Sequence, residues 1–126
     1  MAGKIVADTL EHSSAGSLDT QYVVNGSAKA WARSDFTTTI PDSFNVASLT
    51  DTGSGDNAIN YASNMGNADY SPTVMFEVES GNDTNLNCCV KHGSPTTSSV
   101  GGQTGNTSGT LGDQESLYFT IHGDLA

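Results

Sequence analysis

The sequence predicts an all-β protein, an antiparallel β-sandwich of jelly-roll-like form, and three observations lead to this prediction. Bulky apolar residues alternate with polar ones in several short segments, as they do in strands with one buried face. Serine, threonine, asparagine and glycine occupy 55 of the 126 positions, which suits short strands joined by many polar loops. No segment shows a convincing helical period. Together these features favour two packed antiparallel sheets.

Alternation predicts four strands, at 43–50, 72–79, 85–91 and 115–123. On each, the apolar side chains are expected to share one face: Phe44 and Val46; Val74, Phe76 and Val78; Leu86, Cys88 and Val90; and Leu117, Phe119 and Ile121. A fifth strand carries Ile59 and Tyr61, and the polar stretch 93–113 is expected to hold one short strand. Burial of such a face contributes about 1.5–3 kcal/mol for each large side chain.

Asn25-Gly26 stands between two short β-prone runs and predicts a two-residue hairpin turn. The second arm consists mostly of small residues and ends at Trp31, the only tryptophan of the chain. We interpret Ala28 and Ala30 as small side chains that let another sheet or subunit approach closely, with the indole of Trp31 sealing that contact. The alternative for Trp31 is a platform on which a sugar ring stacks.

The chain is expected to form one domain, a β-sandwich at 20–126, preceded by an extended N-terminal arm at 1–19. The arm contains three spaced apolar residues, Ile5, Val6 and Leu10. Alone it cannot fold, so we expect it to lie on a neighbouring subunit or on a larger assembly.

The supply of large apolar side chains is small, because leucine, isoleucine, valine and phenylalanine number 23. They must offset an ordering cost of about 1–2 kcal/mol for each residue's backbone. A disulfide is not expected to help, since Cys88 and Cys89 are adjacent and a bridge between them would constrain almost no loop. We expect two free thiols, one inward and one outward, and self-association as the source of extra stability.

The formal net charge is −10, and only four residues are lysine or arginine. A protein of this charge with scattered basic residues is not expected to bind nucleic acid or an anionic membrane. No run is long enough to span a bilayer, and the N-terminus lacks the apolar centre of a signal peptide.

The loop Asp51–Asp56 resembles the start of a calcium loop, but Gly53 and Ala62 stand where an EF-hand needs oxygen ligands. A tight turn is therefore expected, without a metal or a cofactor, and an ion held by carboxylates of several associated chains is the open alternative. We expect two outward binding loops, which contain the candidate contact residues Asp51, Ser54, Asp56, Asn57, Thr96 and Asn106.

Catalytic patterns are weak, and we expect that the protein is not an enzyme. The three histidines lack metal-ligand spacing, and no GxSxG nucleophile elbow occurs. Glu77 and Glu79 form a carboxylate pair on the outward face of one strand, where solubilising side chains are more usual than a glycosidase pair.

Several motifs in order resemble a module of tailed-bacteriophage virion proteins. They are NGSAKAW (25–31), DSFNVASLTDTGSGDNAINYASNM (42–65), NADYSPTV (67–74), NTSGTLGD (106–113) and IHGD (121–124). The resemblance runs from about Tyr22 to the end and departs at ARSDFTTTI (32–40), where relatives often carry an aromatic, Asn- and Gly-rich stretch. It implies a homotrimeric β-sandwich on a virion, either at a tail-fibre tip or on the capsid.

Within that family, we expect a capsid decoration, or cement, protein on the outer surface of the virion. The chain opens at a methionine and consists almost entirely of the module, which leaves about 19 residues for docking and none for a fibre shaft. The expected partners are the protein itself, the major capsid protein and, through the outward loops, host surface glycans. The alternative is the receptor-binding distal domain of a tail fibre.

Overall fold

The structure is a computed structural model that describes residues 3, 5–35, 37, 39–78 and 86–126. Its described elements are β1 (Thr9–His12), β2 (Gly16–Asp19), α1 (Thr20–Gly26), β3 (Ala30–Ser34), β4 (Asp42–Phe44), β5 (Val46–Gly53), β6 (Asp56–Tyr61), β7 (Ser71–Glu77), β8 (Leu86–Val90), β9 (Ser99–Asn106) and β10 (Ser116–His122). The prediction of an all-β fold is confirmed in this form, as antiparallel sheets with one short helix in the described part.

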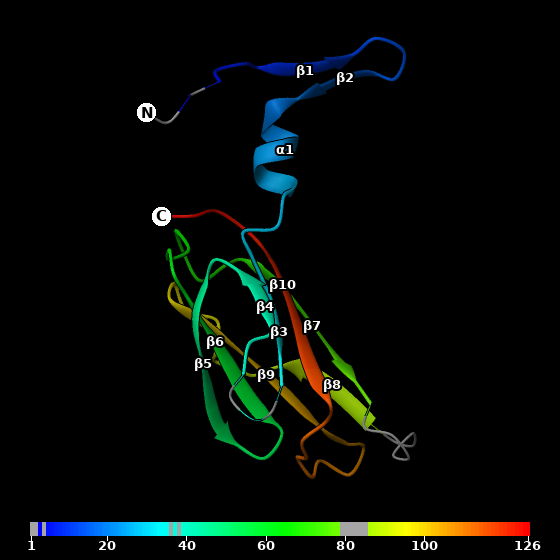
Figure 1. Cartoon of the computed structure of the whole chain (residues 1–126), viewed down its shortest axis with the longest axis vertical. Helices are drawn as coiled ribbons and strands as arrows, with labels where there is room; N and C mark the ends of the chain where they lie inside the picture. The colour runs from blue at the N-terminus through cyan, green and yellow to red at the C-terminus, as the bar shows by residue number, and fades with distance from the viewer. Residues whose placement is uncertain (1–2, 4, 36, 38, 79–85) are drawn as a thin grey trace.

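Two four-stranded sheets make the sandwich, in the orders β4-β3-β10-β7 and β5-β6-β9-β8 (Figure 1). Strands that follow each other in the chain pair as β3–β4, β5–β6 and β8–β9, while β10 returns from the end of the chain to lie between β3 and β7. All of these pairs are antiparallel, so hairpin connections determine much of the order.

The core lies between the two sheets and is built from the predicted alternation. Leu117, Phe119 and Ile121 of β10 are at most 1% exposed, and Val74 of β7 is buried beside them. Ile59 and Val100 face them from the other sheet and are fully buried. The inward face predicted for 115–123 therefore forms the core, as does Val74 of the face predicted for 72–79. Phe76 is half-buried, and the inward position predicted for Val78 is wrong, because β7 ends at Glu77 and Val78 is 37% exposed.

Gly102 of β9 leaves room for core side chains of the opposite sheet. A Cβ atom at this position would lie 2.5 Å from Leu117 Cδ2 and 2.8 Å from Val74 Cγ1, closer than real Cβ contacts. The stretch 93–113 therefore contains more than the expected short strand, since β9 is eight residues long and largely buried. The alternation of bulky and polar residues does not predict β9, because glycines occupy several of its positions and leave room for side chains of the opposite sheet.

The predicted hairpin at Asn25-Gly26 is wrong, because residues 20–26 form α1. A hairpin would need Tyr22–Val24 to pair with β3. Both edges of β3 are already occupied, by Phe44 of β4 and by Thr120 of β10 opposite Trp31. The segment instead closes a short helix, in which the Ser27 N–H donates to the Val23 carbonyl at 3.1 Å.

The predicted strand 43–50 is two strands in different sheets, separated at Asn45. This residue has φ of 55°, a left-handed conformation that asparagine tolerates. Its side chain holds the crossing in place, because Nδ2 donates to the carbonyls of Lys29 and Ser63 at 3.0 Å each. The expectation that Phe44 and Val46 share one face is therefore wrong: Phe44 is 53% exposed, whereas Val46 packs against the core.

The predicted strand 85–91 corresponds to β8, with its expected alternation of half-buried and exposed side chains. Both cysteines are free: Cys88 is half-buried and donates to the Val74 carbonyl at 3.3 Å, while Cys89 is exposed. The expectation of one inward and one outward thiol is confirmed. Position 85 and Glu79 lie outside the described residues.

Candidate functional site

The N-terminal segment, residues 5–26, stands at one end of the sandwich (Figure 1). The expected extended arm is folded back on itself, since β1 and β2 pair as a hairpin and α1 follows directly. Every residue from 5 to 19 is exposed, and α1 has no buried residue. This segment therefore adds almost nothing to the core of the chain.

An apolar cleft of about 360 Å³ runs between the hairpin and α1. Its walls include the three predicted contact residues, Ile5, Val6 and Leu10, together with Val23 and Val24. Ile5 is 92% exposed and Val6 79%. The hairpin is tied to α1 through Thr20, whose N–H donates to the Asp8 carbonyl at 2.8 Å and whose hydroxyl donates to the Ala7 carbonyl at 2.7 Å. The cleft has the composition of a surface that a partner covers.

The second exposed apolar surface is the outer aromatic face, defined as Trp31, Phe44, Met75 and Tyr118. These residues lie on the solvent side of the sheet β4-β3-β10-β7, with exposed fractions between 38% and 58%. Trp31 pairs across the ladder with Phe44, and Tyr118 pairs with Met75. A hollow of about 400 Å³ opens between Trp31 and Tyr118.

Arg33 stands within this face and holds Tyr118 in place. Its guanidinium lies 6.0 Å from the centre of the Tyr118 ring and 3.6 Å from a carboxylate oxygen of Glu77. The Tyr118 hydroxyl donates to the same Glu77 oxygen at 2.7 Å, and this hydrogen bond raises the pKa of Tyr118. Aromatic side chains, methionine and arginine are the residues enriched at protein interfaces.

The structure separates Trp31 from the two alanines, Ala28 and Ala30, that were predicted to share a contact surface with it. Trp31 points outward and Ala28 is half-buried. Ala30 and Ala32 point inward and are at most 3% exposed, so their small side chains fit the chain's own core. The assignment of Ala30 to a subunit contact is therefore corrected, because it has no surface left to offer. Sequence reasoning did not identify Phe44, Met75 and Tyr118 as parts of a site. Met75 and Tyr118 each stand between two inward residues of a predicted strand, and this position indicates that their large side chains point to solvent.

The predicted loop at 51–57 is only partly a loop. Asp51 and Ser54 are exposed at the β5–β6 turn, whereas Asp56 is 8% exposed and Asn57 is fully buried in β6. Burial acts to raise the pKa of Asp56, but hydrogen bonds from Lys91, Thr52 and Gln103 and the charge of Lys91 outweigh it and hold the pKa below its usual value. Lys91 Nζ lies 2.5 Å from the carboxylate. Asp56 and Asn57 are thus structural residues, not outward contacts.

Thr96 and Asn106 are both on the surface but far from each other. Thr96 precedes β9, where its hydroxyl accepts from the N–H groups of Ser98 and Ser99 in a turn. Asn106 ends the same strand, eight residues long, so roughly 25 Å of extended chain separates them. The predicted outward residues therefore fall at opposite ends of the sandwich and do not make one site.

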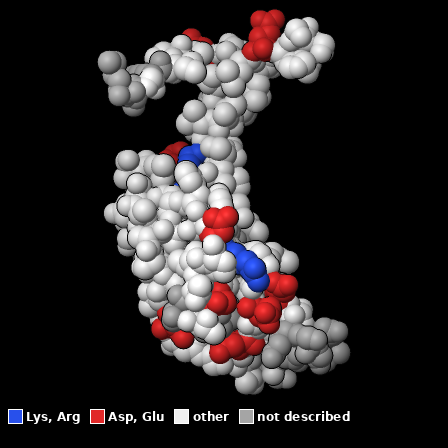
Figure 2. Space-filling view, viewed as in Figure 1, with Lys and Arg blue, Asp and Glu red and all other residues white. Residues whose placement is uncertain are grey.

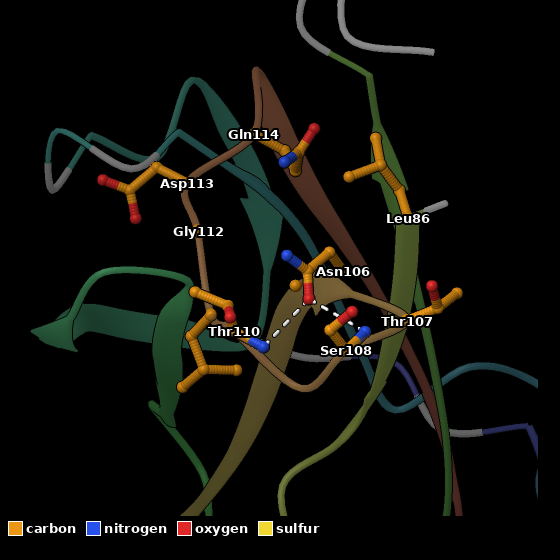
Figure 3. Close-up of a pocket in the computed structure, with 10 residues that line it drawn as sticks. Leu86, Asn106, Thr107, Ser108, Thr110, Gly112, Asp113 and Gln114 are labelled. Carbon is orange, nitrogen blue, oxygen red and sulfur yellow. Dashed lines mark hydrogen bonds between the residues drawn. The ribbon is translucent and has the colours of Figure 1, made fainter. Parts of the chain in front are cut away.

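The end that carries Asn106 lies opposite α1 and contains a polar hollow, the distal pocket (Figures 1 and 3). Its volume is about 360 Å³. Side chains reach it from three places: Leu86 at the start of β8, Asn106 at the end of β9, and Gln114 just before β10. The connection 107–113 completes its wall. Gln114 and Leu86 carry no sequence signal for a site, and only the fold brings them together.

Charge is unevenly distributed over the face in Figure 2. Acidic side chains gather over the part of the sandwich far from the N-terminus, around a basic group, while the N-terminal segment shows mostly uncharged surface. Among the described residues no group of three or more histidine, cysteine, aspartate or glutamate side chains could hold a metal ion. Within the same residues, no helix is long and apolar enough to cross a membrane.

Comparison of the chain with protein-family models, curated proteins and solved structures gave no significant match in any of the three searches.

Proposed function

We propose that the chain is a decoration protein on the capsid of a tailed bacteriophage. It forms a homotrimer and attaches to the major capsid protein. The observation that carries the proposal is the N-terminal segment, which exposes Ile5, Val6 and Leu10 on a unit that buries nothing of its own. The motif resemblance to phage virion modules supplies the biological setting.

The apolar cleft of the N-terminal segment favours attachment energetically. Covering a fully exposed large apolar side chain stabilises a complex by about 1.5–3 kcal/mol, and the cleft offers several. Part of that gain offsets the cost of association and ordering. Residues 5–26 carry three exposed acidic side chains, Asp8, Glu11 and Asp19, and no lysine or arginine, so a partner surface that is neutral or basic at this place favours attachment.

The outer aromatic face is the proposed contact between subunits. A sandwich with few large core residues gains stability when Trp31, Phe44 and Tyr118 are covered by another copy. Arg33 beside Glu77 places both signs of charge on the same surface, which reduces repulsion between two acidic chains. In this arrangement the N-terminal segment points to the shell and the distal pocket points away from it.

Binding to undecorated capsids tests the proposal. Deleting residues 1–26 should abolish attachment while the far-ultraviolet circular dichroism of the sandwich persists, because the deleted segment contributes no core residue. Leu10→Asp should weaken attachment at least tenfold, and Ser14→Asp is the matched control, since it adds the same charge to the exposed β1–β2 turn. Full decoration by the truncated protein would refute the assignment.

The second candidate is the receptor-binding tip of a tail fibre, and the distal pocket favours it because a receptor site is expected at the end remote from the attachment. Copy number separates the two functions. Quantitative mass spectrometry of purified particles should find hundreds of copies for a decoration protein. A number close to that of the tail appendages would instead identify a fibre tip.

A further inference from the structure

The described lining of the distal pocket consists mostly of neutral polar groups. Hydroxyl side chains come from Thr107, Ser108 and Thr110, and amides from Asn106 and Gln114. Among the described residues that line the pocket there is no lysine or arginine, and the one carboxylate, Asp113, accepts from the Gly55 N–H at 2.5 Å through one of its oxygens. A phosphate, sulfate or carboxylate ligand would find no positive charge in this lining, which therefore disfavours an anionic ligand.

Two amide side chains in this pocket have unused hydrogen-bonding capacity. Gln114 is 7% exposed, and its Oε1 is buried without a partner. A buried polar atom of this kind is uncommon and requires an explanation. Rotation about the soft terminal torsion of glutamine exchanges Oε1 and Nε2, so either can face the hollow. The Asn106 amide lies beside it, with Oδ1 already engaged by the loop (Figure 3).

The loop that shapes the pocket is held in place before any ligand arrives. Asn106 Oδ1 accepts from the N–H groups of Ser108 and Thr110, at 3.0 Å each. The Thr104 hydroxyl donates to the Gly112 carbonyl at 2.7 Å. Gly109 has φ of 82°, a conformation that glycine adopts without strain. A preformed loop loses little conformational entropy on binding, which allows even a small ligand to bind.

Apolar surface borders the polar groups. Leu86 faces the hollow from β8, across from Gln114 (Figure 3). Leu111, on the connection after β9, also lines the pocket. The pocket therefore offers aliphatic surface beside its hydrogen-bonding groups. A volume of about 360 Å³ is at the lower end of the range for small-molecule sites.

We propose that the distal pocket binds one ring of a neutral carbohydrate. A sugar ring presents hydroxyls that both donate and accept, as the amides of Asn106 and Gln114 require, and a C–H face that packs on Leu86. This inference rests on the proposed function only for its biological role, a contact with glycans of the host surface. The binding itself needs neither the capsid nor the trimer.

The test uses the purified full chain, uniformly labelled with nitrogen-15, titrated with methyl glucoside, methyl galactoside and methyl mannoside up to 50 mM. At least one sugar should shift the Gln114 side-chain amide resonance and backbone resonances of 106–114, with a dissociation constant in the millimolar range that is usual for one small ring in an open pocket. Sialic acid is the charged probe and should bind at least tenfold more weakly.

Gln114→Met is the decisive variant, because methionine keeps the volume of glutamine and loses its hydrogen bonds. Affinity should fall about tenfold or more, while stability should not fall, since an unpaired buried oxygen is removed. Gln21→Met, the same change on the exposed helix α1, is the matched control and should bind like the unchanged protein.

Several results would overturn the proposal: no shift at 106–114 with any of the three sugars, shifts confined to the Trp31 hollow, or unchanged affinity in the Gln114→Met protein. Preferential binding of sialic acid would equally contradict it. These outcomes are separate from the capsid assay. Loss of sugar binding with normal attachment refutes only the pocket, and sugar binding without attachment refutes only the decoration function.

Discussion

Replacing Gly102 by alanine tests the packing of the two sheets directly. The new Cβ would stand 2.5 Å from Leu117 Cδ2, 2.8 Å from Val74 Cγ1 and 3.2 Å from Phe119 Cε1. Leu117 and Phe119 are at most 1% exposed, so neither has free space into which to move. Overpacking of this kind costs about 1–3 kcal/mol.

A smaller stabilising effect acts in the opposite direction. Alanine reduces the conformational entropy of the unfolded chain, which stabilises the protein by about 0.4–1 kcal/mol where the native conformation permits it. Overpacking at Gly102 outweighs this gain, because three core atoms must shift together. The expected net loss is about 1–2 kcal/mol in the free energy of unfolding, or roughly 3–12 °C in melting temperature for a chain of this size.

Urea unfolding followed by far-ultraviolet circular dichroism measures this difference at a fixed protein concentration, since self-association would make stability depend on concentration. Gly101→Ala is the matched control. Its Cβ would approach side-chain atoms of Ser94 and Lys91 at 3.2–3.3 Å, whereas at Gly102 the new Cβ approaches two buried core side chains at less than 3.0 Å. It should therefore destabilise the protein by clearly less than Gly102→Ala does. Equal stability of the Gly102→Ala and Gly101→Ala proteins would show that β9 does not pack on Leu117 as described.

Side chains outside the core give three further predictions. Lys91→Met should lower the free energy of unfolding at pH 7 by about 1–2 kcal/mol, a figure discounted for the exposure of the lysine. Because the pKa of Asp56 is lowered in the folded protein, its stabilising effect is complete above the unfolded pKa of about 3.9 and is lost as the pH falls through the lower folded pKa. The urea midpoints of the unchanged protein and of the Lys91→Met protein should therefore converge at low pH. Iodoacetamide should alkylate Cys89 at least tenfold faster than Cys88, because burial and the neighbouring thiol raise the pKa of Cys88. Mass spectrometry measures the two rates, and equal rates would contradict the described burial of Cys88. If the chain self-associates as proposed, sedimentation should show that Trp31→Glu weakens the association at least tenfold. Unchanged association would remove the outer aromatic face from the proposed interface.

The candidate site is only partly accessible from the sequence. Ile5, Val6 and Leu10 can be identified as unpartnered apolar residues because nothing around them forms a periodic pattern, and the structure exposes all three. The Gly-rich turn before Asp56 predicts an outward side chain there. Its burial depends on Lys91, 35 residues later, and no local rule relates two residues so distant.

The sequence by itself determined which residues face inward on β8 and β10, although not on the segment 43–50. Alternation around Val74 and Phe119 has a period of two, which is a property of one strand and needs no partner. Two adjacent cysteines on one strand must point to opposite sides, as Cys88 and Cys89 do.

Tertiary structure alone decided which strand lies beside which. Residues 20–26 do not pair with β3, because β4 and β10 occupy both of its edges, and they form a helix instead. The strand expected at 43–50 was divided at Asn45, where the chain passes from one sheet to the other. The distal pocket exists because the start of β8, the end of β9 and the residue just before β10 meet there. Pairing depends on the competition between distant segments for the same sheet edge, and no short stretch of sequence contains that information.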